Sequence, residues 1–322
     1  MVPKYRAVAV AVAATLLQAA MLIAFAWPAS KLAPRDLPVA VSGPEAASLA
    51  NRLHERAGGA FDIVTVADAA AARTAIKDRE VYGAIVTDGG SPTLLVASAA
   101  SPAVAQQLTR MVQQLSGAPA PRIEDVVPTD PDDAGGGGFA AMVLPLVVSS
   151  LAVGYLLSLA VPSIGARLTG LGLYAVGAGL SGAAVVAKFL SLLPGSFLAL
   201  AGIIGLVSVA VAATIVAAGV VAGRIGLGIG GLTFLLLGNP LSAASTGPEM
   251  LPGPWGTIGQ LLPPGAGASL LRSVAFFDGA AALAPTLTLF AWTATALAIF
   301  SFAALRTRAP GATSVPVPAF AA

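Results

Sequence analysis

Long apolar segments dominate the chain after residue 138 and also occupy its start. A bilayer core about 30 Å thick needs roughly 20 apolar residues per helix. The first segment of that length is 7–27. Five more follow at 139–161, 168–187, 196–222, 225–244 and 280–304. The pattern therefore predicts a polytopic α-helical membrane protein with six transmembrane helices.

Two roles compete for residues 7–27, a membrane anchor and a cleaved signal peptide. The apolar region of a signal peptide normally runs about 7–15 residues and ends at small residues. This segment is longer, and Trp27 and Pro28 stand where small residues are needed. We therefore expect an uncleaved N-terminal transmembrane helix over residues 1–28.

Residues 29–138 follow a different pattern, in which short strands alternate with segments of helical spacing. Strands are expected at 37–43, at 61–68 and twice within 81–100, around the turn DGGSP at 88–92. Helices are expected at 45–58, 69–80 and 102–117. The residues expected in the sheet or its core include Ile63, Val64, Val66, Ile85, Val86, Leu94 and Val96. This alternation predicts a small α/β domain with at least one crossover connection.

The α/β domain ends in PTDPDDAGGGG, residues 128–138, which leads into the second apolar segment. Its composition predicts an acidic, flexible hinge. Weak calcium binding is the alternative interpretation, but the spacing of the acids matches no loop with defined ligand geometry.

Composition and charge agree with a membrane protein. Hydrophobic residues make up 57% of the chain and charged residues 10%, whereas soluble domains are about a quarter charged. Of the 32 charged residues, 24 lie within residues 1–138. The rest of the chain is too poor in charge to face water, so lipid must cover it. The sequence pI of about 9.1 reflects the basic loops of membrane proteins rather than nucleic-acid binding.

Residues 29–138 carry nine basic and thirteen acidic residues, a net charge of −4. This balance argues against attraction of anionic polymers or lipid headgroups by overall charge. Cysteine is absent, which excludes disulfides, thiolate catalysis and cysteine-based metal sites.

Basic residues indicate the orientation of the helices, because cytoplasmic loops are enriched in lysine and arginine. They flank alternate ends of the predicted helices at Lys4, Arg6, Arg167, Arg224, Arg306 and Arg308. This arrangement predicts that both termini are cytoplasmic and that residues 29–138 are extracytoplasmic. Lys188 is the exception, at an outer end. It either snorkels to the interface or lines a polar pathway.

Residues 245–279 are too broken for a membrane-spanning helix and too apolar for an ordinary loop. The Asn239–Pro240 step ends the preceding helix, and two short amphipathic pieces follow, joined at the sequence PPG. In the second piece Leu270, Leu271, Val274 and Phe277 share one face, with Arg272 and Asp278 elsewhere. We expect a re-entrant hairpin that dips into the outer leaflet. A flap lying in the headgroup layer is the alternative.

Residues that carry chemistry are sparse. No P-loop sequence occurs, so the chain cannot hydrolyse ATP by that route. The glycines of GRIGLGIGG, residues 223–231, suit close helix packing better than dinucleotide binding. The single histidine, His54, lies on a polar helix face, and one ligand does not make a metal site. We therefore expect no catalytic residues, no cofactor and no metal, and not an enzyme.

An anchor, an external α/β domain, five further membrane helices and a re-entrant pair before the last helix resemble the ABC-2 type permeases. The likeness is closer to the bacterial YhgE/Pip-like membrane proteins (phage infection protein homologues). It is carried by AAARTAIKDREVYGAIV at 70–86, by the segment 238–279 and by the spacing of the helices. The resemblance covers residues 1–308.

This resemblance implies a location in the bacterial cell membrane, with the five helices of residues 139–308 as the membrane domain. The Pro-rich sequence of residues 309–322 separately predicts a disordered cytoplasmic tail. It implies a homodimer that works with a separate nucleotide-binding ATPase subunit. Arg167 falls in the cytoplasmic coupling turn. The residues that fall in the outer gate or re-entrant elements are Glu249, Trp255, Gln260, Arg272 and Asp278.

Apolar lining of the pathway favours export of an amphiphilic or lipid-like substrate, because an ion needs polar groups to replace its hydration shell. The alternative is a non-transporting envelope protein, acting as a receptor, secretion accessory or scaffold through its external domain.

Overall fold

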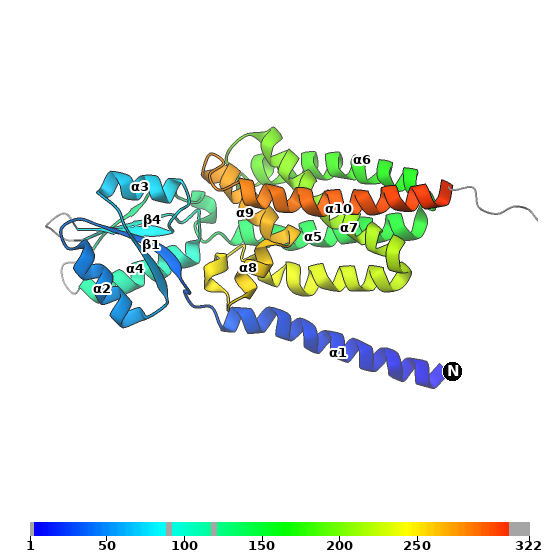
Figure 1. Ribbon diagram of the computed structural model, residues 1–322, viewed down its shortest axis with the longest axis horizontal. Coiled ribbons are helices and arrows are strands. Elements are labelled where there is room, and N and C mark those ends of the chain that lie inside the picture. Colours follow the sequence, from blue (N-terminus) through cyan, green and yellow to red (C-terminus); the bar gives the residue numbers. More distant parts are fainter. Residues whose placement is uncertain (1–2, 88–91, 117–120, 309–322) are drawn as a thin grey trace, which may run out of the picture.

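A computed structural model describes residues 3–87, 92–116 and 121–308. A mixed α/β layer and a bundle of long helices lie end to end, joined by a region of short helices (Figure 1). The expected turn at residues 88–91 and the expected tail at 309–322 lie outside the described residues.

Within the described part of the chain, five helical segments are long and apolar enough to cross a membrane. They are Lys4–Ser30, Gly137–Ala160, Ile164–Phe189, Phe197–Gly238 and Leu283–Ala303. The corresponding helices are α1 (Pro3–Ser30), α5 (Gly137–Ala160), α6 (Ile164–Ala183), α7 (Phe197–Leu232) and α10 (Leu283–Arg308). Two of them continue as π-helices, η2 (Ala184–Phe189) and η3 (Thr233–Gly238). These segments are compatible with a polytopic helical membrane protein.

The longest helix, α7, is broken where two expected segments meet. Ala222 (φ −127°, ψ 17°) and Gly223 (φ 55°, ψ −135°) leave the helical conformation. Beyond the break, a Cβ atom on Gly226 would lie 1.9 Å from the Ala218 carbonyl oxygen. A Cβ on Gly230 would lie 2.9 Å from the end of the Ile215 side chain. The chain therefore reverses at Gly223, and the two halves of this helical segment lie antiparallel.

The second half ends at Gly238 rather than at the expected residue 244. Asn239 and Pro240 then enter a 3₁₀ turn, η4 (Pro240–Ser242). Proline lacks the N–H that would continue the helical hydrogen bonds. The helix therefore ends several residues earlier than expected, because the Asn239–Pro240 step interrupts it.

Close backbone packing holds α6 against α7. A Cβ on Gly179 would lie 2.3 Å from the Ala201 carbonyl oxygen, and one on Gly205 would lie 2.6 Å from that of Ala175. Only glycine permits such an approach, as is usual between membrane helices. Helix α7 is accordingly the most buried of the apolar helices.

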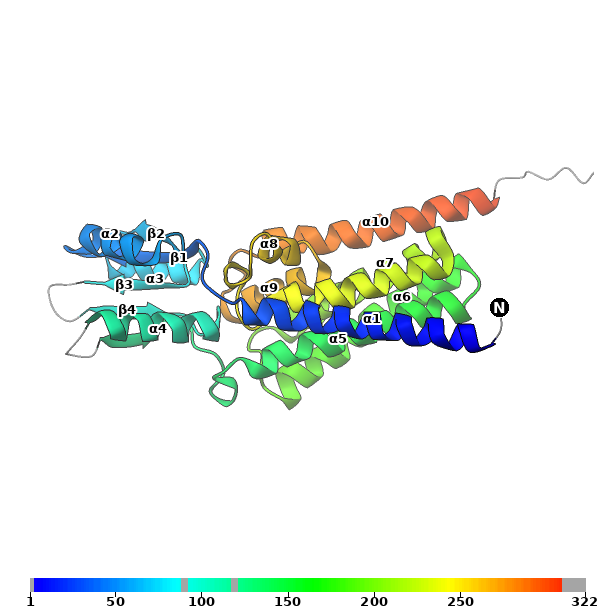
Figure 2. The same ribbon diagram turned by 90° about the horizontal axis from the view of Figure 1, so that it is seen from below.

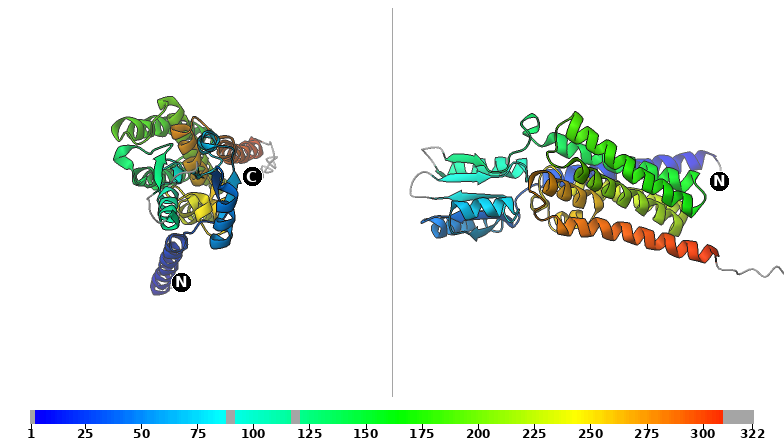
Figure 3. Two further views of the ribbon diagram at one scale, coloured as in Figure 1. Left: turned by 90° about the vertical axis from the view of Figure 1, so that its left-hand side faces the viewer. Right: turned by 90° about the horizontal axis from the view of Figure 1, so that it is seen from above.

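Helix α1 diverges from the bundle toward the N-terminus (Figures 1 and 3). Its apolar side chains, including Val10, Leu16 and Ile23, are exposed along most of its length. Only its C-terminal end reaches the rest of the protein, where the ring of Trp27 meets Trp255 edge-on at 6.3 Å. A helix so apolar and so exposed requires lipid or another protein around it.

The α/β layer contains a five-stranded sheet of order β2-β1-β3-β4-β5. Its strands are β1 (Leu37–Ser42), β2 (Phe61–Thr65), β3 (Gly83–Val86), β4 (Thr93–Val96) and β5 (Arg122–Asp125). Its helices are α2 (Ala46–Ala57), α3 (Ala69–Lys77) and α4 (Pro102–Ser116). Strand β1 pairs in parallel with β2 and β3, β3 pairs antiparallel with β4, and β4 pairs in parallel with β5.

Both faces of this sheet are covered. Val39 and Val41 of β1 pack with residues of α2 and α4, whereas Ala40 packs with Ala72 and Ile76 of α3. Alternate side chains of a strand point to opposite faces, so β1 is buried on both sides. Strands and helices thus form a mixed α/β layer, in which the parallel pairs β1–β2 and β1–β3 require crossover connections.

The residues expected in the sheet differ in burial according to whether their strand is central or at an edge. Ile85, Val86, Leu94 and Val96 are buried on the central strands. Ile63 and Val66 are half-buried, and Val64 is 42% exposed because β2 is an edge strand. Strand β5, with the polar sequence RIED, was not expected.

The acidic linker contains a short turn and a cap for the helix that follows it. The Asp133 carboxylate accepts hydrogen bonds from the backbone N–H groups of Gly138 (2.9 Å) and Phe139 (3.1 Å) at the start of α5. Asp130 accepts one from Asp132 (2.9 Å) within the turn η1 (Pro131–Asp133). A carboxylate satisfies the free N–H groups and the dipole of a helix N-terminus. Asp133 therefore caps α5, and the flexibility expected of this linker stays a prediction.

Candidate functional site

Two short helices, α8 (Trp255–Gln260) and α9 (Pro263–Phe276), lie between the α/β layer and the long helices (Figures 2 and 3). The 3₁₀ turn η5 (Pro248–Met250) precedes them. Most of α9 is buried, and a Cβ on Gly267 would lie 2.6 Å from Val207 of α7. The hairpin is therefore packed within the protein rather than lying on its surface.

The segment before α8 fastens the hairpin to the α/β layer. The backbone N–H of Ala33 and the guanidinium of Arg35 both donate to the Met250 carbonyl, at 3.1 and 3.0 Å. The Ser101 hydroxyl donates to the Thr246 carbonyl at 2.7 Å. Met250 also packs into the apolar core of the layer. We call the contact region between the layer and residues 243–273 the junction.

Tyr82 and Glu249 make a side-chain contact across the junction. The Tyr82 hydroxyl, at the start of β3, donates a hydrogen bond to the Glu249 carboxylate at 2.6 Å. Burial raises the pKa of the Tyr82 hydroxyl, and the nearby Glu249 carboxylate raises it further. Tyr82 therefore remains a protonated donor at neutral pH.

Arg79 also reaches from the layer to the hairpin. It follows α3 in a left-handed conformation, with φ at 61°. Its guanidinium donates to the Ser269 carbonyl (3.1 Å) and to the Ser273 hydroxyl, and it lies over the ring of Phe277 at 5.4 Å. Burial lowers the pKa of Arg79, and the neighbouring Tyr82 and Glu249 oppose that shift.

Arg272 is buried in α9, with 5% of its surface exposed. Its guanidinium donates to the Ala244 carbonyl at 2.6 Å and lies over the Phe139 ring at 4.5 Å. The sequence pattern placed Arg272 away from the apolar face of the second piece and made no prediction of its burial. The side chain is buried because α9 is enclosed by the layer, α5 and α7 rather than packed on one side only.

A cavity of about 430 Å³ lies at the junction. Arg79 and Tyr82 line it from the α/β layer, and Glu249, Gln260 and Arg272 line it from the hairpin. Gln260 is held in place by two bonds, donating to the Ser242 carbonyl (3.2 Å) and accepting from the Ser269 hydroxyl. The start of α10 completes the wall with Ala284, Pro285 and Thr288.

The structure brings together three of the expected gate residues and separates the others. Glu249, Gln260 and Arg272 line the junction cavity. Trp255 lies outside that lining, against Trp27 of α1. Asp278 is exposed after α9, in a left-handed conformation with φ at 49°.

Arg167 and Lys188 lie away from the junction cavity. The Arg167 guanidinium folds back onto the end of α5, donating to the carbonyls of Val161 (2.7 Å) and Ser158 (3.0 Å). Lys188 is exposed in the π-helix η2. Its expected roles, at the interface or in a polar pathway, stay predictions.

Arg79 and Tyr82 were missed by sequence reasoning. Tyr82 lies 167 residues from Glu249 along the chain, and Arg79 lies 194 residues from Ser273. A local sequence pattern cannot predict contacts between residues so far apart in the chain. The one available signal was a tyrosine at the start of an otherwise apolar strand, VYGAIV.

Among the described residues, no group of three or more histidine, cysteine or acidic side chains is arranged to hold a metal. His54 is exposed on α2. Comparisons with protein-family models, characterised proteins and solved structures find no match to this chain.

Proposed function

We propose that this protein is a permease-like membrane subunit whose outer gate is the α8–α9 hairpin, with the α/β layer as its extracytoplasmic regulator. One observation carries the proposal. The hairpin is enclosed by apolar helices on one side and is bonded on the other to the layer through Arg35, Tyr82 and Arg79. A displacement of the layer must therefore displace the hairpin or break those bonds. A coupling of this kind suits a gate.

The proposed topology has six membrane crossings, with the two halves of α7 counted separately. The helix turns that carry Arg167 and Arg224, and the start of α1 with Lys4 and Arg6, lie at the end of the bundle remote from the α/β layer (Figure 1). Cytoplasmic ends are enriched in basic residues. We therefore place both termini in the cytoplasm of a bacterial cell and the layer outside.

Cysteine labelling tests this topology, because the natural chain contains no cysteine. Asp62 of β2 and Arg224 at the turn of α7 are both exposed. In intact cells, a membrane-impermeant maleimide should label Asp62→Cys and should label Arg224→Cys only after permeabilisation. The reverse pattern overturns the orientation.

An amphiphilic or lipid-like substrate is the cargo that we propose. A second cavity of about 590 Å³ lies between α5 and α6, and Met142, Leu146 and Val186 are among its lining residues. Apolar walls cannot replace the hydration shell of an ion. They do accommodate an acyl chain.

The chain has no P-loop, so we propose that a homodimer uses a separate nucleotide-binding subunit. The test is a pull-down of the full chain in mild detergent, with an ATPase assay of the captured material. A P-loop ATPase should copurify, and Arg224→Glu at the exposed α7 turn should reduce its capture. Asp62→Lys on the α/β layer is the control and should leave capture unchanged. Absence of any nucleotide-binding protein, with normal export in the deletion strain, would overturn this function.

A non-transporting envelope protein is the second candidate, and Arg167 favours it. Its guanidinium is occupied by α5 carbonyls, and residues 161–163 alone connect α5 to α6. Little surface is left there for an ATPase to bind. In that case the deletion phenotype should be restored by a chain that binds no ATPase, and lost when exposed residues of the α/β layer are changed.

A further inference from the structure

The junction cavity brings two arginine side chains to one space from opposite sides. Arg79 comes from the α/β layer and Arg272 from α9, and the two guanidinium groups interact electrostatically. Neither makes an ion pair with a carboxylate among the described residues. Burying a charge without a counter-ion is costly, so these groups favour an anion between them.

The acids that line the cavity make no ion pair with either arginine in the described part of the chain. Glu249 is engaged by Tyr82 through a hydrogen bond of 2.6 Å, and it acts on Arg79 but not on Arg272. Glu80 also lines the cavity but is exposed, and it forms no ion pair with either arginine. Asp130 and Asp133 border Arg272 in a second, smaller cavity, but among the described residues no carboxylate lies within ion-pair distance of its guanidinium.

Both guanidinium groups keep free hydrogen-bonding capacity. Each carries five N–H donors. Arg79 uses one terminal nitrogen for its two acceptors, and Arg272 uses one for the Ala244 carbonyl. The remaining donors of two guanidinium groups match the oxygens of a phosphate or carboxylate, which arginine binds in a planar, bidentate manner.

The rim of the cavity is apolar on the side of α10. Leu261, Ala281 and Ala284 are exposed and line the opening. They lie beside the start of α10, one of the apolar helices long enough to cross a membrane. A ligand held at the arginines therefore meets an apolar exit next to the lipid phase. The volume of about 430 Å³ lies within the usual range for small-molecule sites.

We propose that the junction cavity binds the anionic headgroup of an amphiphile between Arg79 and Arg272, with its acyl chain leaving along the first turns of α10. The claim that this ligand is the cargo of a gate rests on the proposed function. The claim that it binds at the junction rests on the cavity alone. The shared chemistry is an oxyanion, and the attached chain distinguishes a lipid from free phosphate.

Binding to the full chain in detergent tests the site with three probes. They are short-chain phosphatidic acid, the matching diacylglycerol without phosphate, and inorganic phosphate. Phosphatidic acid should bind most tightly. If the diacylglycerol binds equally well, the anionic group is not what the site recognises. If inorganic phosphate binds equally well, the acyl chain does not contribute to binding. No saturable binding of phosphatidic acid overturns the site.

Three variants assign that binding to the cavity. Arg79→Gln should weaken phosphatidic acid binding about tenfold or more, because a hydrogen bond to a charged group is lost. Glu249→Gln should strengthen binding severalfold, since a negative charge is removed while the hydrogen-bonding shape is kept. A misfolded variant cannot bind more tightly. Arg110→Gln, at an exposed residue of α4, is the matched control and should change nothing.

The two proposals can fail separately. If the variants shift binding as expected but the deletion strain exports normally, the site stands and the permease function fails. If export depends on the protein but neither Arg79→Gln nor Glu249→Gln changes binding, the function stands and the site is wrong.

Discussion

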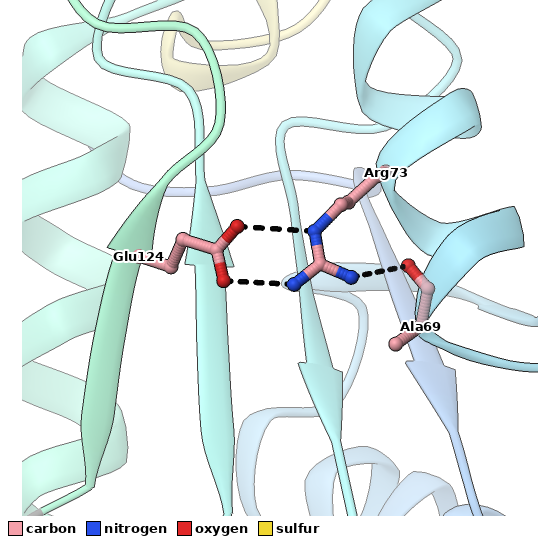
Figure 4. Close-up of polar contacts among 3 residues, drawn as sticks. All are labelled: Ala69, Arg73 and Glu124. Carbon is pink, nitrogen blue, oxygen red and sulfur yellow. Dashed lines mark hydrogen bonds and ion pairs between the residues drawn. The ribbon is translucent and has the colours of Figure 1, made fainter.

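The α/β layer uses arginine differently on its free surface and at the junction. On the free surface, Arg73 of α3 donates two hydrogen bonds to Glu124 of β5, at 3.0 and 2.8 Å, and a third to the Ala69 carbonyl (Figure 4). Both side chains are more than a third exposed. At the junction, Arg79 has no carboxylate in ion-pair distance among the described residues and bonds instead to α9.

The Arg73–Glu124 contact lies within the α/β layer, whereas the contacts of Arg79 and Tyr82 join the layer to the hairpin. The exposed Arg73–Glu124 pair lies in a high dielectric and is screened by salt, so it stabilises little. Tyr82, Glu249 and Arg79 at the junction are partly buried, and losing one partner leaves the other unsatisfied. The bonds of Tyr82 and Arg79 should therefore determine how firmly the layer holds the hairpin.

The largest expected effect lies in the hairpin. A Cβ on Gly259 of α8 would lie 1.8 Å from the Leu241 carbonyl oxygen, so Gly259→Ala must displace backbone. We expect a loss of about 3 kcal/mol or more in the free energy of unfolding, measured by thermal unfolding in detergent. Gly202→Ala on α7, where nothing lies within 4 Å, is the control. Equal melting of both variants would contradict the close packing.

A smaller effect is expected when one bond across the junction is removed. Tyr82→Phe leaves the Glu249 carboxylate without its hydroxyl donor, which should cost about 1.5–3 kcal/mol. Hydrogen exchange of residues 243–251 should rise, while that of the exposed Arg73–Glu124 region should not. Unchanged exchange at 243–251 would show that the bond does not hold the hairpin.

The same bond should respond to alkali. The pKa of Tyr82 is raised in the folded state, so its stabilisation is complete below the ordinary tyrosine pKa of about 10. It is lost as the pH rises through the higher folded-state pKa. The stability difference between the natural chain and Tyr82→Phe should therefore shrink above about pH 10. A constant difference across that range would be inconsistent with this assignment.

The smallest effect is expected on the free surface. Hydrogen bonding to Arg73 lowers the pKa of Glu124, so its stabilisation is present at neutral pH and is lost as the pH falls through the folded-state pKa. Because the pair is exposed, Glu124→Gln should cost at most about 1 kcal/mol. The cost should vanish in acid and in high salt. A loss as large as that of Tyr82→Phe would remove the contrast between the two regions.

Sequence reasoning succeeded where one local pattern decides the structure. Apolar length predicted the long helices, and the strand–helix alternation predicted the α/β layer, because each depends on neighbouring residues and on burial of one face. It missed β5, whose four residues Arg122–Asp125 carry too little apolar character to read as a strand. It also treated the acids of 128–138 as a flexible charge run, although Asp133 caps α5.

The candidate site was predictable only in part. Glu249 and Arg272 stood out because charged residues are rare in that part of the chain, whereas Gln260 was named only through the family resemblance. Their partners did not stand out, since Arg79 and Tyr82 belong to a charged region where such residues are ordinary. Arg167 stood out for the same reason as Arg272, but its guanidinium donates hydrogen bonds to carbonyl groups at the end of α5.

By itself, the sequence determined where this chain is apolar enough for lipid, where it alternates between strand and helix, and where proline and glycine interrupt a helix. These are local properties, governed by hydrogen bonding and burial within about 20 residues. Only the tertiary structure decided which polar residues meet at the junction. Arg35 and Met250 lie 215 residues apart, and Tyr82 and Glu249 lie 167 apart. Such contacts depend on how the layer and the hairpin pack as whole surfaces, and no short segment encodes that.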